Sequence, residues 1–291
     1  MTRFRALVVA LLVVLALGGC RGLPGASDEP STSGSPSVSG PSESSSGSAS
    51  ASPSARPVVP PAPKLAACYR LSPGQLTRPT NASGAVSCRG RHTAQTIYVG
   101  RLDTVVEGHA VAVDSATVQR QLSTVCPRKL QAYVGGSTDT RRLSRFNVVW
   151  YSPTLDQSDQ GADWFRCDVI AFAGREQLAP LPGTQRLRGV LDDARALSDY
   201  GLCGTAAPGE RGFERVICGR KHSWRAIDTI GIAGGSKYPG ATSVRKAGNS
   251  ACKDRARARS GNTLKFRYGW EWPSREQWSR GQHSGVCWVQ G

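Results

Sequence analysis

Val86-Ser87-Cys88-Arg89-Gly90-Arg91-His92 occurs a second time in the chain, as Val216-Ile217-Cys218-Gly219-Arg220-Lys221-His222. Each copy ends in Cys, three residues and His, and an alternating apolar run follows each, at residues 97–99 and 227–230. The two stretches predict a tandem duplication.

The match extends outward from these two stretches. Cys68 corresponds to Cys203, and Cys126 corresponds to Cys252. Five further residues lie 120 positions before their counterparts: Trp150, Pro153, Gln157, Gly161 and Cys167 precede Trp270, Pro273, Gln277, Gly281 and Cys287. A constant offset favours duplication over chance and predicts two repeats of similar fold.

The N-terminus has the three parts of a secretory signal. Arg3 and Arg5 precede an apolar run of about twelve residues, which is short of the ~20 that a membrane-spanning helix needs. Gly18-Gly19 before Cys20 resembles the lipobox of bacterial lipoproteins, which implies that residues 1–19 are a signal peptide and that Cys20 is lipidated. We therefore expect a lipid anchor on the extracytoplasmic face of the cell membrane. The alternative is an ordinary cleaved signal that ends near a cysteine.

After Cys20, the chain to residue 64 is nearly all Ser, Pro, Gly and Ala. Such a segment cannot bury enough apolar surface to fold, so residues 20–64 are predicted to be a lipidated, disordered stalk.

Residues 65–291 are predicted to be α+β, with two repeats at 65–173 and 199–291 and a linker with a short helix at 174–198. Each repeat is expected to be a small, mostly antiparallel sheet with one main helix, in the order strand-strand-helix-strand-strand. In the first repeat Asp114-Ser115 is a good N-cap, and Pro127 is expected to break or restart the helix. In the second repeat the helix is expected at residues 251–259 and is weaker, with Gly248 inside the pattern. Strands are expected into Cys88, at residues 146–151 and at residues 264–272, and the short linker helix is expected at residues 190–197.

Eight cysteines lie in this region, four in each repeat. In an exported protein they favour disulfides, and three patterns remain if both repeats bond internally and alike. We choose the pattern that joins neighbouring early strands and ties the helix to the last strand: Cys68 with Cys88, Cys126 with Cys167, Cys203 with Cys218, and Cys252 with Cys287.

The repeated Cys-x-x-x-His also raises the alternative of a zinc site. Basic neighbours at Arg89, Arg91, Arg220 and Lys221 oppose a thiolate site, and we expect neither a metal nor a cofactor. His92 and His222 are expected to hold the turn before the next strand by a ring hydrogen bond, with contact to a ligand as the alternative.

The formal net charge is +16 and is unevenly placed. Residues 65–198 hold 16 basic and 11 acidic residues, whereas residues 199–291 hold 16 and 7. An exported basic surface attracts anionic lipid or cell-wall polymer, whereas nucleic acid is not expected at that location. The alternative is that these residues only form a solvated surface.

The candidate binding residues lie beside the second motif and on the second helix. Arg255 and Arg259 are four residues apart, as are Lys253 and Arg257, so one side of the helix is expected to present most of the charge. The full candidate set is His92, His222, Arg220, Lys221, Lys253, Arg255, Arg257 and Arg259. Trp270, Trp272 and Trp278 are expected in the core, with a surface platform as the alternative.

Enzyme signatures are sparse. Ser243-Val244-Arg245-Lys246 matches the Ser-x-x-Lys of penicillin-recognising enzymes, but their Ser-Asp-Asn and Lys-Thr-Gly motifs are absent. We therefore expect no catalytic residues. The alternatives are a cell-wall-modifying enzyme that uses Ser243 and Lys246, or a passive structural spacer.

The arrangement of motifs over residues 65–291 resembles the septum formation domain of actinobacterial envelope lipoproteins and membrane proteins. The resemblance rests on Val-x-Cys-x-x-x-His, on Tyr133-Val134-Gly135, and on Trp150-x-x-Pro153 with Gly161 before Cys167. Arg91 and Lys221 stand where the family's motif usually has proline. The resemblance implies a non-enzymatic envelope protein linked to septum formation and cell division, with a septal protein as a possible partner.

Overall fold

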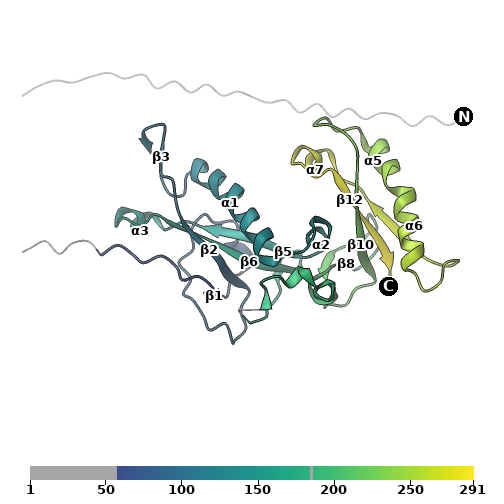
Figure 1. Ribbon diagram of the computed structural model, residues 1–291, viewed down its shortest axis with the longest axis horizontal. Helices are drawn as coiled ribbons and strands as arrows, with labels where there is room; N and C mark the ends of the chain where they lie inside the picture. The colour runs from purple at the N-terminus through teal and green to yellow at the C-terminus, as the bar shows by residue number, and fades with distance from the viewer. Residues whose placement is uncertain (1–57, 184–185) are drawn as a thin grey trace, which may run out of the picture. The chain divides into compact units, whose positions relative to one another are not determined.

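The computed structural model describes residues 58–183 and 186–291. Within them, two five-stranded sheets and a two-stranded hairpin are all antiparallel, and helices cover the larger sheets (Figure 1). The predicted α+β class is therefore confirmed. The predicted signal peptide, Cys20 and the stalk up to residue 57 lie outside the described residues. No helix in the described part of the chain is long and apolar enough to cross a membrane.

The first sheet has the strand order β1-β2-β6-β5, and β7 pairs with β6. Its strands are β1 (Cys68–Tyr69), β2 (Ala94–Arg101), β5 (Phe146–Tyr151), β6 (Trp164–Gly174) and β7 (Gln177–Leu178). The predicted strand leading into Cys88 is reduced to one bridge between Cys68 and Val86.

Helix α1 (Ala116–Val134) packs on one face of this sheet through Val118, Leu122 and Cys126. Its predicted N-cap is confirmed, because the Ser115 side chain accepts from the backbone N–H of Val118. The predicted break at Pro127 is wrong, since the helix runs through this residue. Proline removes one backbone hydrogen bond, but the buried residues before it hold the helix on the sheet.

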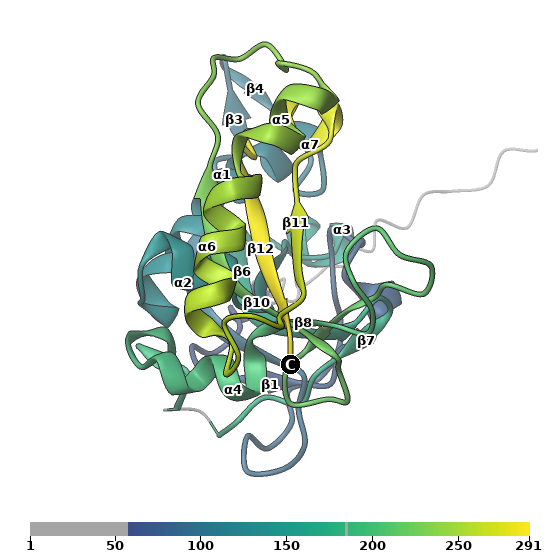
Figure 2. The same ribbon diagram turned by 90° about the vertical axis from the view of Figure 1, so that its right-hand side faces the viewer.

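The second sheet has the order β11-β12-β10-β8-β9. Its strands are β8 (Leu202–Gly204), β9 (Arg215–Ile217), β10 (Trp224–Gly231), β11 (Tyr268–Glu271) and β12 (Ser284–Gln290). Helices α5 (Ala241–Ala247) and α6 (Asn249–Arg259) follow one another beside this sheet (Figure 2). The long predicted strand at 264–272 is shorter than expected, because residues 260–267 form a loop after α6.

Several short elements were not predicted. They are the hairpin β3 (Val105–Val106) and β4 (His109–Ala110), and the helices α2 (Thr138–Arg142), α3 (Leu155–Asp159) and α7 (Arg275–Ser279). The short helix expected at residues 190–197 is replaced by two 3₁₀ turns, and α4 (Leu197–Tyr200) follows them.

The matching positions of the two repeats have matching structural roles. Gln157 and Gln277 each complete a capping box at the start of α3 and α7. Gly161 and Gly281 follow these helices with φ of 92° and 87°, a left-handed conformation that favours glycine. The positions that the repeats share therefore maintain the fold.

The four disulfides join Cys68 to Cys88, Cys126 to Cys167, Cys203 to Cys218, and Cys252 to Cys287. This is the predicted pairing. In each repeat one bond joins the first strand, β1 or β8, to the cysteine of the Cys-x-x-x-His motif, and the other ties the main helix to the last long strand. Cys126, Cys167, Cys252 and Cys287 are fully buried, so these two bonds lie in the cores.

Trp270 fits into the second core because glycines flank its ring. A Cβ on Gly248, between α5 and α6, would lie 2.2 Å from the Trp270 ring, and a Cβ on Gly285 would lie 2.3 Å from it. The indole Nε1–H donates to the carbonyl of Val244 at 3.2 Å. Gly248, which weakened the helical pattern in the sequence, is therefore needed for this approach.

The two repeats are joined by backbone hydrogen bonds. The N–H of Leu202 donates to the carbonyl of Leu143 at 2.7 Å, and the N–H of Arg145 donates to the carbonyl of Tyr200 at 2.8 Å. Leu143 of the first repeat is buried in the same apolar cluster as Leu202, Trp224 and Trp288 of the second. The segment between the repeats packs on the first core, where Leu187 is fully buried.

Candidate functional site

The two motif histidines hold their turns in the predicted way. His92 Nδ1 lies 2.9 Å from the carbonyl oxygen of Gly90, and His222 Nδ1 lies 2.7 Å from that of Arg220. His92 is 1 % exposed, so its ring is closed off from a ligand at the surface. The alternative that His92 contacts a ligand is therefore not supported.

Other basic residues of the second motif lie at the boundary between the repeats. Arg220 is exposed and its Nη1 donates to Gln177 Oε1 of β7 at 2.5 Å, while Lys221 is exposed beside it. Arg215 is half-buried and pairs with Glu271 at 2.5 Å. The motif thus supplies contacts between the repeats as well as surface charge.

Helix α6 carries the other four candidate residues, and all of them are exposed. Arg255 forms an ion pair with Asp228 of β10 at 2.7 Å and donates to the carbonyl of Thr229. Arg257 lies 3.9 Å from Asp254 and over the ring of Phe266.

The predicted single charged side of α6 is wrong. Cys252 and Ala256 are buried and face the sheet. At ~100° per residue, Lys253 and Arg257 lie on one side of this buried line, and Arg255 and Arg259 lie on the other. The helix therefore presents basic residues on both flanks.

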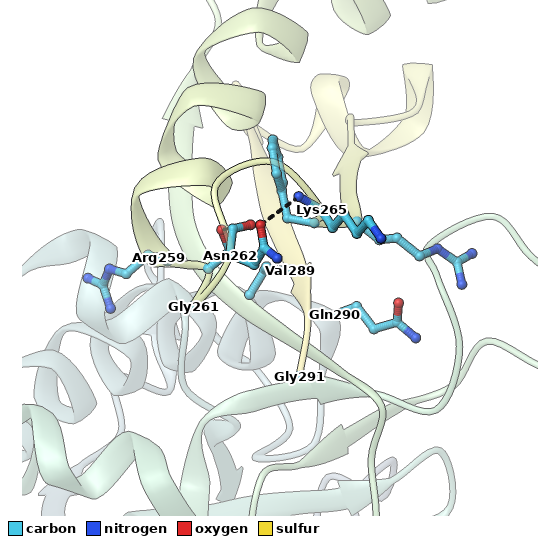
Figure 3. A pocket seen from close by; sticks show the side chains of 10 residues that line it. Arg259, Gly261, Asn262, Lys265, Val289, Gln290 and Gly291 are labelled. Carbon is cyan, nitrogen blue, oxygen red and sulfur yellow. Dashed lines mark hydrogen bonds between the residues drawn. The ribbon is translucent and has the colours of Figure 1, made fainter.

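An open groove of about 810 Å³ lies at the C-terminal end of α6. Its charged side chains are Arg259, Lys265 and Arg267, and no Asp or Glu side chain lines it. Figure 3 shows the Arg259 and Lys265 side chains extending away from one another on opposite sides of the hollow. Asn262 Oδ1 accepts from the backbone N–H of Lys265 at 3.0 Å and fixes the loop between them. Of the three cations, Arg267 has an acidic neighbour, Glu210 at 3.6 Å.

The tryptophans do not form the alternative surface platform. Trp270 is 6 % exposed and Trp278 is 1 % exposed, as the core interpretation predicted. Trp272 is 37 % exposed beyond the end of β11, so the expectation that it lies in the core is wrong. Its side chain is therefore separated from the other two.

Ser243 and Lys246 lie one turn apart on α5, and both are exposed. Among the hydrogen bonds of the described residues, none joins the two side chains. A serine nucleophile needs a base within hydrogen-bond reach and a site that excludes water. The geometry therefore does not favour the penicillin-recognising alternative.

A buried polar centre in the first repeat was not predicted. Arg166 and Asp168 of β6 have side chains that are 3 % and 0 % exposed, and Arg166 Nε lies 3.1 Å from Asp168 Oδ2. The guanidinium lies over the rings of Tyr69 and Tyr151, at 3.8 and 4.9 Å from their centroids. Thr96 Oγ1 donates to Asp168 Oδ1 at 2.8 Å.

Burial raises the pKa of Asp168 to about 6, although Arg166 and the Thr96 hydrogen bond oppose this shift. In the second repeat the positions of Arg166 and Asp168 are occupied by Val286 and Trp288. The centre thus belongs to the first repeat alone. Its burial makes it part of the framework rather than a surface for ligands.

Among residues 58–183 and 186–291, no three His, Cys, Asp or Glu side chains are placed to hold a metal ion.

A sequence model of the septum formation family matches residues 65–287, which include all four disulfides and both sheets except the last residues of β12. The chain belongs to the septum formation family. The resemblance seen in the sequence is therefore confirmed. No curated protein and no solved structure matches the chain.

Membership of the septum formation family suggests a role in septum formation or cell division. The family is not a known enzyme family.

Proposed function

We propose that this septum formation protein is a non-enzymatic envelope-binding module, held by lipidated Cys20 at the extracytoplasmic face of the membrane. Its ligand is an anionic lipid surface or an anionic cell-wall polymer. The observation that carries this proposal is the groove at the end of α6, where three basic side chains and no Asp or Glu side chain line an open hollow. Lys253 and Arg257 add exposed basic side chains on the flank of α6 opposite Arg259.

The free energy that the basic side chains of α6 contribute to binding follows from their number and their partners. Each basic side chain near an anionic membrane contributes about 1 kcal/mol. Arg255 contributes less, because Asp228 already pairs with it. Lys253, Arg257 and Arg259 together should therefore account for about a hundredfold in affinity.

We expect the triple variant Lys253→Gln, Arg257→Gln, Arg259→Gln to lose most of its binding to phosphatidylglycerol vesicles and to isolated cell wall. The protein for this test is the chain from residue 20 onward with Cys20→Ser, so that no lipid contributes. Binding is measured by sedimentation at 0.1 M and 1 M salt. The Debye length falls from about 10 Å to about 3 Å over this range, so binding of the unsubstituted chain should fade at high salt.

The matched control is Arg89→Gln, Arg120→Gln, Arg128→Gln, which removes three exposed arginines from the first repeat. It changes the net charge by the same amount and should keep most of the binding. Equal loss in both variants, or binding that ignores salt, would show that the α6 residues are only a solvated surface.

The link to the septum is tested by location. We expect a fluorescently tagged full-length chain to be enriched at the septum of dividing cells, because the family is associated with septum formation. The same tag on a Cys20→Ala chain should leave the membrane if Cys20 is the anchor. An even distribution around the cell would contradict the septal part of the proposal and leave envelope binding intact.

A further inference from the structure

A second hollow, of about 260 Å³, lies where the two repeats meet. Arg142 and Arg145 reach it from the first repeat, and Arg215 reaches it from the second. No carboxylate lines this hollow, and the polar side chains of Thr229, Gln282 and Ser284 complete its wall. Three arginines, two from the stretch 142–145 and one from β9, therefore line one small space.

The acidic partners of these arginines only partly compensate the positive charge. Arg142 Nη1 lies 3.6 Å from Asp139 Oδ1, a carboxylate oxygen that also accepts from Thr229 Oγ1. Arg215 Nη2 lies 2.5 Å from Glu271 Oε1. Both carboxylates stand outside the lining of the hollow.

Arg145 has backbone partners. Its Nε donates to the carbonyl of Phe172 at 3.0 Å, and its Nη2 donates to that of Arg215 at 3.4 Å. The pKa of Arg145 is lowered to about 10, first by burial and then by the charge of Arg215, while Glu214 raises it. Burial is the larger cause, and the Arg215 charge acts in the same direction.

One donor at the junction is unused. The Nε–H of Arg215 is buried and has no hydrogen-bond partner in the described part of the chain. A buried polar group without a partner costs free energy, so an acceptor brought into this region would be favoured.

A neighbouring hollow of about 400 Å³ shares Arg145 and Arg215 but also contains Glu214 and Glu271. These carboxylates repel an anion. The difference between the two hollows assigns the anion to the smaller one.

We propose that the hollow between Arg142, Arg145 and Arg215 binds a phosphate group and thereby links the two repeats. Guanidinium groups match the oxygens of phosphate with directed, charge-assisted hydrogen bonds. A carboxylate offers two oxygens in one plane, whereas a phosphate offers three or four in a tetrahedron. Three arginines that line one small hollow can supply donors to several oxygens of such a group.

This site is separate from α6 and goes beyond the proposed envelope binding. Its lining residues differ from those of the groove at the end of α6. The phosphate can belong to a free ion, a wall polymer or a lipid head group. Binding at one site can therefore be lost while binding at the other is retained.

The test uses the chain from residue 20 with Cys20→Ser and three probes: inorganic phosphate, a short poly(glycerol phosphate), and phosphatidylglycerol vesicles. Calorimetric titration should show one site for at least one probe, and Arg142→Gln should weaken it about tenfold, the effect of losing one charge-assisted hydrogen bond. Arg142 is exposed and pairs loosely with Asp139, so this change should leave the fold intact. Binding of inorganic phosphate would identify the free ion, and binding of one larger probe alone would identify the polymer or the membrane.

The matched control is Arg280→Gln, which removes one exposed arginine paired with Glu276 on α7. It should leave the affinity unchanged, and so should the α6 triple variant with inorganic phosphate. A second variant, Gln282→Ala, should weaken binding without changing the charge. Absence of saturable binding for all three probes, or equal weakening by Arg142→Gln and Arg280→Gln, would overturn the proposal.

Discussion

Arg166→Met should lower the free energy of unfolding by about 3–5 kcal/mol at pH 8, the cost of removing one partner from a buried ion pair. The methionine side chain can still pack on Tyr69 and Tyr151, so the main loss is the charge that faces Asp168. Without Arg166, the ionised carboxylate is buried without compensation. Urea denaturation followed by circular dichroism measures the loss.

The loss should be smaller at pH 5. In the unsubstituted chain the folded-state pKa of Asp168 is about 6, above the ordinary value of 3.8. The folded state therefore binds more protons than the unfolded state between these values, and this group's contribution to stability is lost as pH rises from about 4 to 6. At pH 5 Asp168 is mostly protonated in both folded chains, so less charge is left unpaired.

Arg101→Met is the matched control. Arg101 pairs with Asp163 at 2.5 Å, but its side chain is 82 % exposed. Exposed pairs contribute about 0–1 kcal/mol, so this variant should be nearly neutral at both pH values. Equal losses in the two variants, or a larger loss for Arg166→Met at pH 5 than at pH 8, would contradict the role of burial.

Removing the disulfide between Cys126 and Cys167 with two alanines should cost about 4 kcal/mol. The bond closes a loop of 41 residues and restricts the unfolded chain. The same change at Cys203 and Cys218, which are 15 residues apart, should cost about 3 kcal/mol. Urea denaturation of both variants under non-reducing conditions checks the order.

Both cysteines of the larger loop are fully buried, so their alanines also leave space in the core between α1 and β6. Cys203 and Cys218 are 0 % and 6 % exposed, so their alanines leave space as well, and the expected difference between the two variants comes from loop length. A greater loss for the shorter loop would contradict the expected order. Peptide mass mapping of the unsubstituted chain without reductant should find the four bonds and no free thiol in residues 65–291.

The duplication made much of the fold predictable. Because each cysteine has a counterpart, three pairing patterns remained for both repeats, and the positions of the strands favoured one. The predicted strand at 146–151 has the bounds of β5, since its Val and aromatic residues alternate between two covered faces. The roles of Gln157 and Gly161 emerged only with the structure, although their constant offset marked them.

Features that belong to one repeat alone could not be inferred from the duplication. Polar and apolar residues alternate along Arg166-Cys167-Asp168, a pattern that is typical of a strand with one solvated face. The polar face is nevertheless buried, and its burial depends on the loop between β1 and β2. Nothing in the sequence marked Arg142 and Arg145 as site residues. They line a hollow with Arg215 only because the two repeats are in contact. The prediction that one side of α6 carries most of the charge was wrong because it did not use the two buried residues, Cys252 and Ala256, to orient the helix.

The hydrogen bonds between Leu143 and Leu202 and between Arg145 and Tyr200 have a consequence for genetics. A chain truncated between the repeats would lose these partners and expose Leu202, Trp224 and Trp288 where Leu143 had covered them. The phenotype of such a deletion would report misfolding and degradation of the remaining half. Alleles with single exposed substitutions, such as Arg142→Gln or Lys253→Gln, are the means to separate what each half does in the cell.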